Sequence, residues 1–391
     1  MQANTLEAKE LPFPVSVYQE RVERVRQGMA AAGIEVLLLH SPENLFYISG
    51  YNTPGYYYGY QSLVIPLEAE PFMILRRVEE SNVRGRSWLS KWDIYTDTDD
   101  PIDVAIGALV REKLDRKWIG LNRGTRFLTP AECEKLQAGL PNATFVDGYG
   151  LVEALRRVKS EQEIDYLRRA ARATEAGMAA GVEAAVEGNS EDDIAAATYS
   201  ALIRAGSEYP GMPPMIAAGY RSGLAHTTWE GHKRIERGDV VLLEIPAAVQ
   251  RYHAVFARSV VIGKPPARYR EIERVIREAA DAAIASIRPG ITAAEADHAQ
   301  RSVIVRAGYS DHFLHRTAYA LGIAFPPHWD EGGIMSLKPG NNQVLEPNMV
   351  FHLISALYFY AEACFAITET IRVTENGCET ITDFPRELIV H

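Results

Sequence analysis

The chain has 391 residues, a formal net charge of -10 and three cysteines. A typical domain holds roughly 100–200 residues, so we expect at least two domains, each with a substantial core. The 47% hydrophobic and 24% charged residues exclude a disordered or fibrous chain, and the acidic balance argues against nucleic acid as a partner.

The cysteines and the N-terminus favour a reducing, cytoplasmic setting. Cys133, Cys364 and Cys378 are too few and too scattered for a disulfide framework or a CxxC metal site. Residues 1–18 are acidic and interrupted by prolines, unlike a secretory signal. No stretch approaches about 18 uninterrupted apolar residues, so we expect no membrane-spanning segment and no membrane partner.

Residues 1–150 alternate helix-like and strand-like stretches, which is typical of an α/β domain. Apolar residues at helical spacing predict a helix over residues 18–32, followed by an apolar strand over residues 36–39. Residues 63–65 and 72–75 read as the two strands of a hairpin. Further expected elements are a short strand at 118–121 and a short helix opened by the capping box of Thr129 and Glu132.

From residue 155 the chain changes to long helices separated by extended apolar runs. Ser160 and Glu163 form a capping box at the start of the first helix, on which Ile164 and Leu167 share one face. Further helices are predicted at 190–203, 269–287 and 292–305, and strands at 240–245, 252–262, 349–353 and 367–373. This pattern predicts an α+β domain with a curved sheet and a division into residues 1–154 and 155–391.

Histidine, glutamate and tyrosine gather in four stretches of the second domain. These stretches are residues 223–226, 238–258, 315–329 and the strand pair 345–352 with 367–377. In this order they resemble the pita-bread hydrolases, a family that includes methionine aminopeptidase, aminopeptidase P, prolidase and creatinase. The resemblance covers the whole chain and implies a pita-bread C-terminal catalytic domain preceded by a creatinase-type α/β N-terminal domain.

The resemblance also locates the positions at which the peptidase branches hold two metal ions through Asp, His and Glu side chains. In this chain those positions hold Glu244, Val255, Tyr319, Ile354 and Thr368, with Glu369 one residue beyond the last. Valine and isoleucine cannot donate a lone pair to an ion, and a two-metal site needs bridging carboxylates. We therefore expect no metal cofactor.

The polar groups that remain favour a metal-independent enzyme over an inactive peptidase relative. The creatinase branch implies that this fold hydrolyses a C–N bond with a histidine and glutamates alone. Residues 243–245, 251–254, 322–329 and 377–388 resemble the ectoine hydrolases of the family. The predicted reaction is hydrolysis of a C–N bond in a small zwitterion, an ectoine-like cyclic amidine first and a creatine-like guanidine second.

Such a reaction needs a base for water, a proton for the departing nitrogen and negative charge beside a cationic substrate. His226 is the predicted acid/base, because histidine both takes and gives a proton near neutrality. Glu244 and Glu369 are candidates for water activation, cation binding or direct attack on the substrate. On a regular strand the one-residue offset would turn Glu369 to the opposite face. The expected substrate-binding residues are His253, His315, Tyr319, Trp329, Tyr56 and Tyr57.

Alternative interpretations stay open at this point. Glu244 could belong to a structural ion pair, and the tyrosines near residue 56 could form an ordinary loop. The competing functions are a metal-dependent Xaa-Pro peptidase and a non-catalytic binding protein for a small molecule. The resemblance to creatinase also implies a homodimer in which the N-terminal domain of one subunit caps the site of the other.

Overall fold

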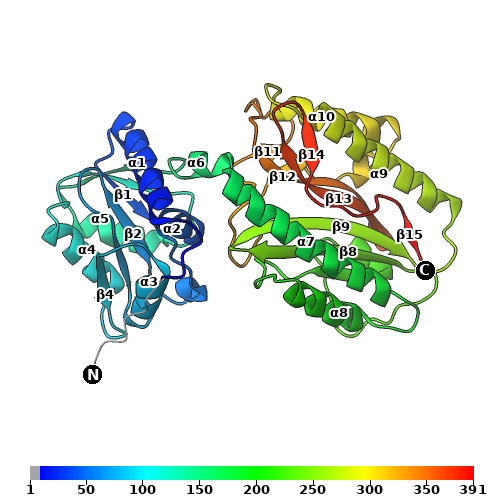
Figure 1. Ribbon diagram of the computed structural model, residues 1–391, viewed down its shortest axis with the longest axis horizontal. Coiled ribbons are helices and arrows are strands. Elements are labelled where there is room, and N and C mark those ends of the chain that lie inside the picture. Colours follow the sequence, from blue (N-terminus) through cyan, green and yellow to red (C-terminus); the bar gives the residue numbers. More distant parts are fainter. Residues whose placement is uncertain (1–8) are drawn as a thin grey trace. The chain divides into compact units, whose positions relative to one another are not determined.

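The computed structural model describes residues 9–391, and its internal contacts divide the chain into unit 1, Met1–Arg156, and unit 2, Arg157–His391 (Figure 1). The boundary expected between residues 154 and 155 falls close to this division. Of the N-terminal stretch that we compared with a secretory signal, residues 1–8 lie outside the described part. None of the helices within residues 9–391 combines the length and the apolarity needed to cross a bilayer.

Unit 1 is built on a six-stranded sheet in the order β4-β3-β2-β1-β5-β6. The strands are β1 (Val36–Leu39), β2 (Ser62–Pro66), β3 (Phe72–Arg76), β4 (Trp92–Tyr95), β5 (Trp118–Leu121) and β6 (Thr144–Asp147). The helices are α1 (Val15–Ala31), α2 (Pro42–Ser49), α3 (Glu80–Arg86), α4 (Pro101–Arg111) and α5 (Pro130–Gly139), with short 3-10 turns η1 (Pro54–Tyr57) and η2 (Arg77–Glu79). The short helix α6 (Glu153–Arg157) ends at the first residue of unit 2.

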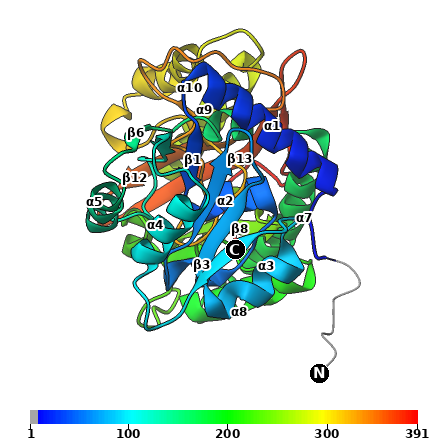
Figure 2. The same ribbon diagram turned by 90° about the vertical axis from the view of Figure 1, so that its left-hand side faces the viewer.

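The unit 1 sheet is mixed and has helices on both faces. The predicted hairpin is confirmed, because β2 and β3 pair antiparallel with Leu63 opposite Met73, whereas β1 pairs parallel with β5. Figures 1 and 2 show α4 and α5 on one side of the strands and α1 and α3 on the other. Val36 and Leu38 alternate along β1 toward a core that includes Leu109 of α4.

Unit 2 contains a nine-stranded sheet whose main path is β11-β10-β12-β13-β9-β8-β7, with β14 paired to β13 and β15 to β9. The strands are β7 (Met215–Ala218), β8 (Val240–Val249), β9 (Tyr252–Val261), β10 (Ala318–Ala320), β11 (Ser336–Leu337), β12 (Val350–Phe359), β13 (Ala363–Val373), β14 (Cys378–Thr380) and β15 (Ile389–Val390). The helical elements are α7 (Glu161–Ala184), α8 (Glu191–Arg204), α9 (Ala267–Ser286), α10 (Ala293–Arg306), η3 (Gly219–Gly223) and η4 (Ser310–His312).

The predicted capping boxes set the start of three helices. The side chains of Thr129, Ser160 and Thr292 each accept the backbone N–H three residues later, and the glutamate at that position returns to the cap. On α7 the predicted apolar face is buried, with Ile164 and Leu167 fully inaccessible. This face packs α7 against β8 and β9, and α9 packs against β12 and β13 (Figure 1).

Strand register brings the chemically important positions of unit 2 to one face of the sheet. In the β8–β9 hairpin Glu244 stands opposite Ala257, and in the β12–β13 pair Ile354 stands opposite Thr368. Directly opposed residues project from the same face, and successive residues alternate between faces. Residues far apart in the sequence therefore meet over the sheet.

Candidate active site

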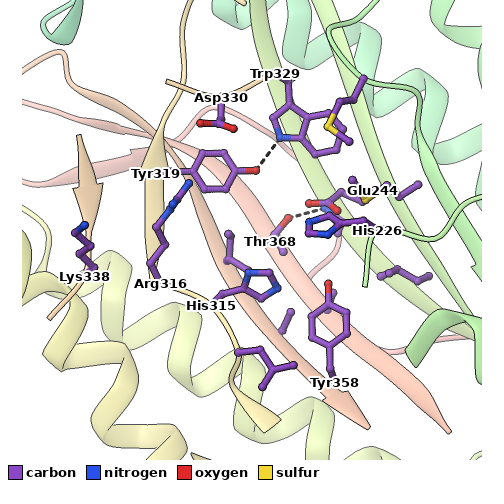
Figure 3. A pocket seen from close by; sticks show the side chains of 18 residues that line it. His226, Glu244, His315, Arg316, Tyr319, Trp329, Asp330, Lys338, Tyr358 and Thr368 are labelled. Atoms are coloured by element: carbon purple, nitrogen blue, oxygen red, sulfur yellow. Dashed lines mark hydrogen bonds between the residues drawn. The ribbon is translucent and has the colours of Figure 1, made fainter. Parts of the chain in front are cut away.

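A cavity of about 690 Å³ lies over this face of the unit 2 sheet. Its apolar wall follows the period of the strands, with Leu242 on β8 and with Ile354 and Ala356 on β12. Ten polar or aromatic side chains that line it are labelled in Figure 3: His226, Glu244, His315, Arg316, Tyr319, Trp329, Asp330, Lys338, Tyr358 and Thr368. The cavity therefore combines an apolar floor with convergent polar groups, as ligand sites do.

Glu244 is the carboxylate that projects from β8 into the apolar part of the cavity. Its side chain is only 14% exposed, and its Oε1 lies 3.8 Å from Nε2 of His352. Burial raises the pKa of Glu244 from 4.5 to about 7, because the charged form loses solvation. A carboxyl group with this pKa exchanges its proton near neutrality, which suits a general base.

His226 lines the same cavity from the segment that follows η3. Its backbone φ is +60°, in the left-handed region that costs a non-glycine residue about 1–2 kcal/mol. Figure 3 shows its ring on the same side of the cavity as Glu244. The structure thus brings together the two residues that the sequence paired, although their catalytic roles remain predictions.

A second group of charges occupies another part of the cavity. Arg316 lies with its guanidinium carbon 4.8 Å from the ring centroid of Tyr319, and Figure 3 shows Lys338 on the same side. Burial, with smaller effects of His226 and Arg316, lowers the pKa of His315 to about 4. The His315 imidazole is therefore neutral at pH 7, and it lies 5.3 Å from the Tyr358 ring.

Hydrogen bonds connect Tyr319 and Trp329, two predicted site residues, to His352, which the sequence did not predict, and through it to Thr368. Trp329 Nε1 donates to Tyr319 Oη over 2.7 Å, and Tyr319 Oη lies 2.7 Å from His352 Nδ1. The other ring nitrogen of His352 lies 2.7 Å from Thr368 Oγ1. Burial lowers the pKa of His352 to about 3, so the ring is neutral. The sequence does contain one indication of His352. It precedes Ile354 by two residues on the same strand, and alternate residues of a strand project from the same face.

The structure corrects the expected catalytic role of Glu369. This side chain is buried, lies 2.5 Å from Nη2 of Arg258 and accepts a hydrogen bond from the Thr382 hydroxyl. The pairing of β12 with β13 is continuous from Val350 to Phe359, so no bulge shifts the strand. Glu369 therefore faces away from the cavity that Thr368 lines, and it serves as the partner of a buried cation.

His253 does not line the cavity, and its side chain is held by the backbone instead, so the structure gives its expected role in substrate binding no support. The Gly211 amide donates to His253 Nε2 over 2.8 Å, so the single ring hydrogen is on Nδ1 and is donated to the Arg251 carbonyl at 2.8 Å. A Cβ atom at Gly211 would lie 2.0 Å from the carbonyl oxygen of His328, which only glycine avoids. His253 thus fixes the segment beside the cavity residue Met212.

Tyr56 and Tyr57 belong to unit 1 and are not among the residues that line the unit 2 cavity. Tyr56 is buried with its ring 5.4 Å from that of Phe127, whereas Tyr57 is 62% exposed. Their role in substrate binding therefore stays a prediction.

The donor set of the cavity does not fit a two-metal centre. Ile354 lines the cavity where the peptidases supply a carboxylate, and Val255 is buried in β9 without lining it. The Thr368 oxygen accepts the backbone N–H of Ala257 over 2.7 Å. Within residues 9–391 no group of three or more His, Cys, Asp or Glu side chains could hold an ion. Of the positions at which the peptidases hold their ions, all of them among the described residues, only Glu244 provides a carboxylate here, and one carboxylate is not enough for a two-metal centre.

Comparisons with known proteins place this site in a family. The model described as metallopeptidase family M24 matches residues 165–375, and the creatinase/prolidase N-terminal domain matches residues 21–158. An ectoine hydrolase from Halomonas elongata is 31% identical, with 97% of this chain and 98% of that protein covered. A Xaa-Pro dipeptidase from Pyrococcus horikoshii is 28% identical, with 96% and 100% covered. The solved prolidase structure from Pyrococcus horikoshii has a TM-score of 0.82 and 26% identity, with 95% and 100% covered.

These matches span both units and confirm the predicted fold class, a creatinase-type N-terminal domain followed by a pita-bread domain. The matches also agree with the resemblance to the pita-bread hydrolases, which rested on motifs of the second domain. The chain therefore belongs to metallopeptidase family M24, a family of hydrolases.

Proposed function

We propose that this protein is a metal-independent hydrolase that cleaves a C–N bond in a small zwitterion. A cyclic amidine such as ectoine is the preferred substrate, and a creatine-like guanidine is the second. The observation that carries this proposal is the replacement of metal-binding side chains around a buried Glu244 whose pKa is about 7. The 31% identical relative described as an ectoine hydrolase supports the choice of substrate class.

In the proposed reaction Glu244 takes a proton from a water molecule whose oxygen attacks the amidine carbon. The new C–O bond gives a tetrahedral intermediate, and its C–N bond then breaks as the departing nitrogen takes a proton from His226. Glu244 also lies where it can stabilise the positive charge of the planar amidinium group. Direct attack by the carboxylate is the alternative first step, with water then hydrolysing the acyl intermediate.

The charges of the cavity match a zwitterion with separated charges. Glu244 supplies negative charge on one side, and Arg316 and Lys338 supply positive charge elsewhere in the same cavity, where the side chain of Asp330 also lies (Figure 3). A substrate carboxylate would pair with the guanidinium in the bidentate geometry that arginine favours. The rings of Tyr319 and Trp329 provide aromatic surface for the body of a small substrate.

Replacement of Arg316 by Gln is expected to raise KM for a zwitterionic substrate by about 10–100-fold, with a smaller change in kcat. Arg316 binds the carboxylate in the ground state and in the transition state alike. Lys338→Gln should act in the same direction but less, because lysine binds as a point charge. Initial-rate kinetics on both variants measure the effect. A substrate analogue whose carboxylate is amidated should no longer distinguish Arg316→Gln from the parent protein; continued discrimination would contradict the assignment.

The pH dependence of turnover should follow the ionisation of Glu244. Only the carboxylate accepts a proton from water, so the acidic limb of kcat/KM is expected to rise with pH through about 7. The measurement is the pH profile of kcat/KM on a substrate whose own charge stays constant over the range. A profile that is flat through neutrality would contradict the role of Glu244 as base.

A metal-dependent Xaa-Pro dipeptidase is the second candidate function, and the 28% identical relative of that description favours it. A substrate panel of ectoine, creatine and Xaa-Pro dipeptides separates the two activities. Binding of ectoine in calorimetry without turnover would instead favour a non-catalytic binding protein.

We also propose that the protein works as a homodimer, as the likeness to creatinase implies, and in the cytoplasm, as its few scattered cysteines favour. Light scattering on the purified chain tests this state, and a mass equal to one chain of 43.4 kDa would contradict it. Replacement of the exposed Tyr57 by Ala then tests whether unit 1 contributes to substrate binding.

A further inference from the structure

A chain of four side chains runs beside the cavity from Trp329 to Thr368. Its links are the 2.7 Å contacts from Trp329 Nε1 to Tyr319 Oη, from Tyr319 Oη to His352 Nδ1 and from His352 Nε2 to Thr368 Oγ1. His352 is fully buried, and Trp329 and Thr368 are 3% and 2% exposed. These buried polar groups therefore hydrogen-bond to one another.

The number of hydrogens on each group determines which atom donates and which accepts in each hydrogen bond of this series. The indole N–H of Trp329 can only donate, so Tyr319 Oη accepts from it. The one hydroxyl hydrogen of Tyr319 then goes to His352 Nδ1, which must be unprotonated. A neutral imidazole carries its hydrogen on the other nitrogen, so His352 Nε2 donates to Thr368 Oγ1. The low pKa of His352, about 3, keeps the ring in this neutral form.

The hydroxyl of Thr368 can then act only as a hydrogen-bond donor to a further group. Its oxygen accepts from His352 Nε2 and from the backbone N–H of Ala257, so both lone pairs are used. Its hydrogen remains available to an acceptor. The Oε1 atom of Glu244 lies 3.8 Å from the same Nε2 atom, which is too far for a hydrogen bond to the ring. Figure 3 shows the oxygen of Thr368 directed toward the Glu244 carboxylate.

We propose that Tyr319 and His352 are positioning residues that hold the Thr368 hydroxyl as a hydrogen-bond donor to Glu244. Thr368 fixes one carboxylate oxygen and leaves the other free for water or substrate. A charge-assisted hydrogen bond of this kind also favours the ionised carboxylate. Other titratable groups near Glu244 are His226, His315, Tyr358 and Cys364.

The direction of the chain can be measured without any substrate. Nitrogen NMR of the protein labelled with ¹⁵N-histidine reports the tautomer of each of its 10 histidines, and the signal lost in His352→Gln identifies His352. We expect His352 to carry its hydrogen on Nε2 throughout the range from about pH 5 to 9. In Tyr319→Phe, which lacks the donor to Nδ1, part of the population should move its hydrogen to Nδ1. A parent protein with the hydrogen on Nδ1, or a protonated ring, would overturn the proposal.

The effect on Glu244 is tested by kinetics and rests on the proposed function. Thr368→Val removes the hydroxyl at nearly constant volume, and we expect kcat/KM to fall about tenfold or more. Loss of a donor raises the pKa of the carboxyl group, so the acidic limb should move to higher pH by about one unit. Thr368→Ser keeps the donor and should restore both the rate and the limb.

Two outcomes of that comparison count against the proposal: an unmoved acidic limb in Thr368→Val, or a serine variant no better than the valine variant. A purely structural role for Thr368 would change the melting temperature without moving the limb. If no member of the substrate panel is turned over, the proposed function fails, and the tautomer of His352 alone decides the direction of the chain.

Discussion

Replacement of Glu244 by Gln is expected to lower turnover by about 10²–10⁴-fold while leaving the fold intact. Glutamine has the same shape but cannot take a proton from water or carry negative charge beside an amidinium group. Glu244 also lies in an apolar wall and is 14% exposed, so few solvent molecules could replace it as a base. Initial rates at saturating substrate measure the loss, and Glu375→Gln, on an exposed turn, serves as the matched control.

The same variant has a predicted signature in stability. The pKa of Glu244 is raised from 4.5 to about 7 in the folded protein, so its ionisation is disfavoured by folding. The stability that the neutral group contributes is fully present below pH 4.5 and is lost as the pH rises through about 7. Thermal circular dichroism should therefore show Glu244→Gln melting at a higher temperature than the parent protein at pH 8.

The activity measurement decides the catalytic role. If Glu244→Gln keeps most of the turnover of the parent protein, Glu244 is not the catalytic base.

The second large effect concerns the buried pair of Arg258 and Glu369. Glu369→Gln is expected to lower the free energy of unfolding by about 3–5 kcal/mol, because it leaves a buried guanidinium without its counter-charge. Arg258 is fully buried and also donates to the carbonyls of Phe384 and Pro385, so the pair fastens the C-terminal segment to the sheet. Denaturant titration measures the loss. Turnover per folded molecule should remain close to that of the parent, because Glu369 does not line the cavity.

A surface pair provides the control for this prediction. Arg274 and Glu278 form an i,i+4 pair at 3.0 Å with side chains 53% and 49% exposed. Glu278→Gln should cost less than about 1 kcal/mol, because solvent screens the charges. The double replacement of Arg258 and Glu369 by Met should recover much of the stability that Glu369→Gln loses. Loss of turnover in Glu369→Gln without loss of stability would instead show that Glu369 is catalytic.

Much of the fold could be predicted because local chemistry determined it. The capping boxes at Ser160 and Thr292 fix where helices begin, and the alternation of apolar residues fixes which strands are buried. The exact ends of strands such as β12 depend on their partners instead. The sequence predicts a strand over residues 349–353, whereas pairing with β13 extends it to Phe359.

The site was predictable where a position in a motif also faced the cavity. Glu244, His226 and Tyr319 meet this condition. Glu369 and His253 lie outside the cavity lining because their side chains bind long-range partners, Arg258 and the Gly211 amide, and no local pattern contains that information.

The residues that sequence reasoning missed share a different property. His352 hydrogen-bonds to Tyr319 from another strand, and Arg316 lines the cavity from the loop before β10. The position of His352 depends on cross-strand register, here Tyr319 opposite His352, which the chain does not encode in a short motif.

The most direct test of this account is turnover of ectoine by protein that has been stripped with a chelator and verified by elemental analysis. We expect the C–N bond of ectoine to be cleaved at the same rate before and after stripping, with far less than one metal ion per chain. Activity that disappears with the metal and returns with manganese, cobalt or zinc would show that the ions, rather than Glu244 and His226, activate the attacking water.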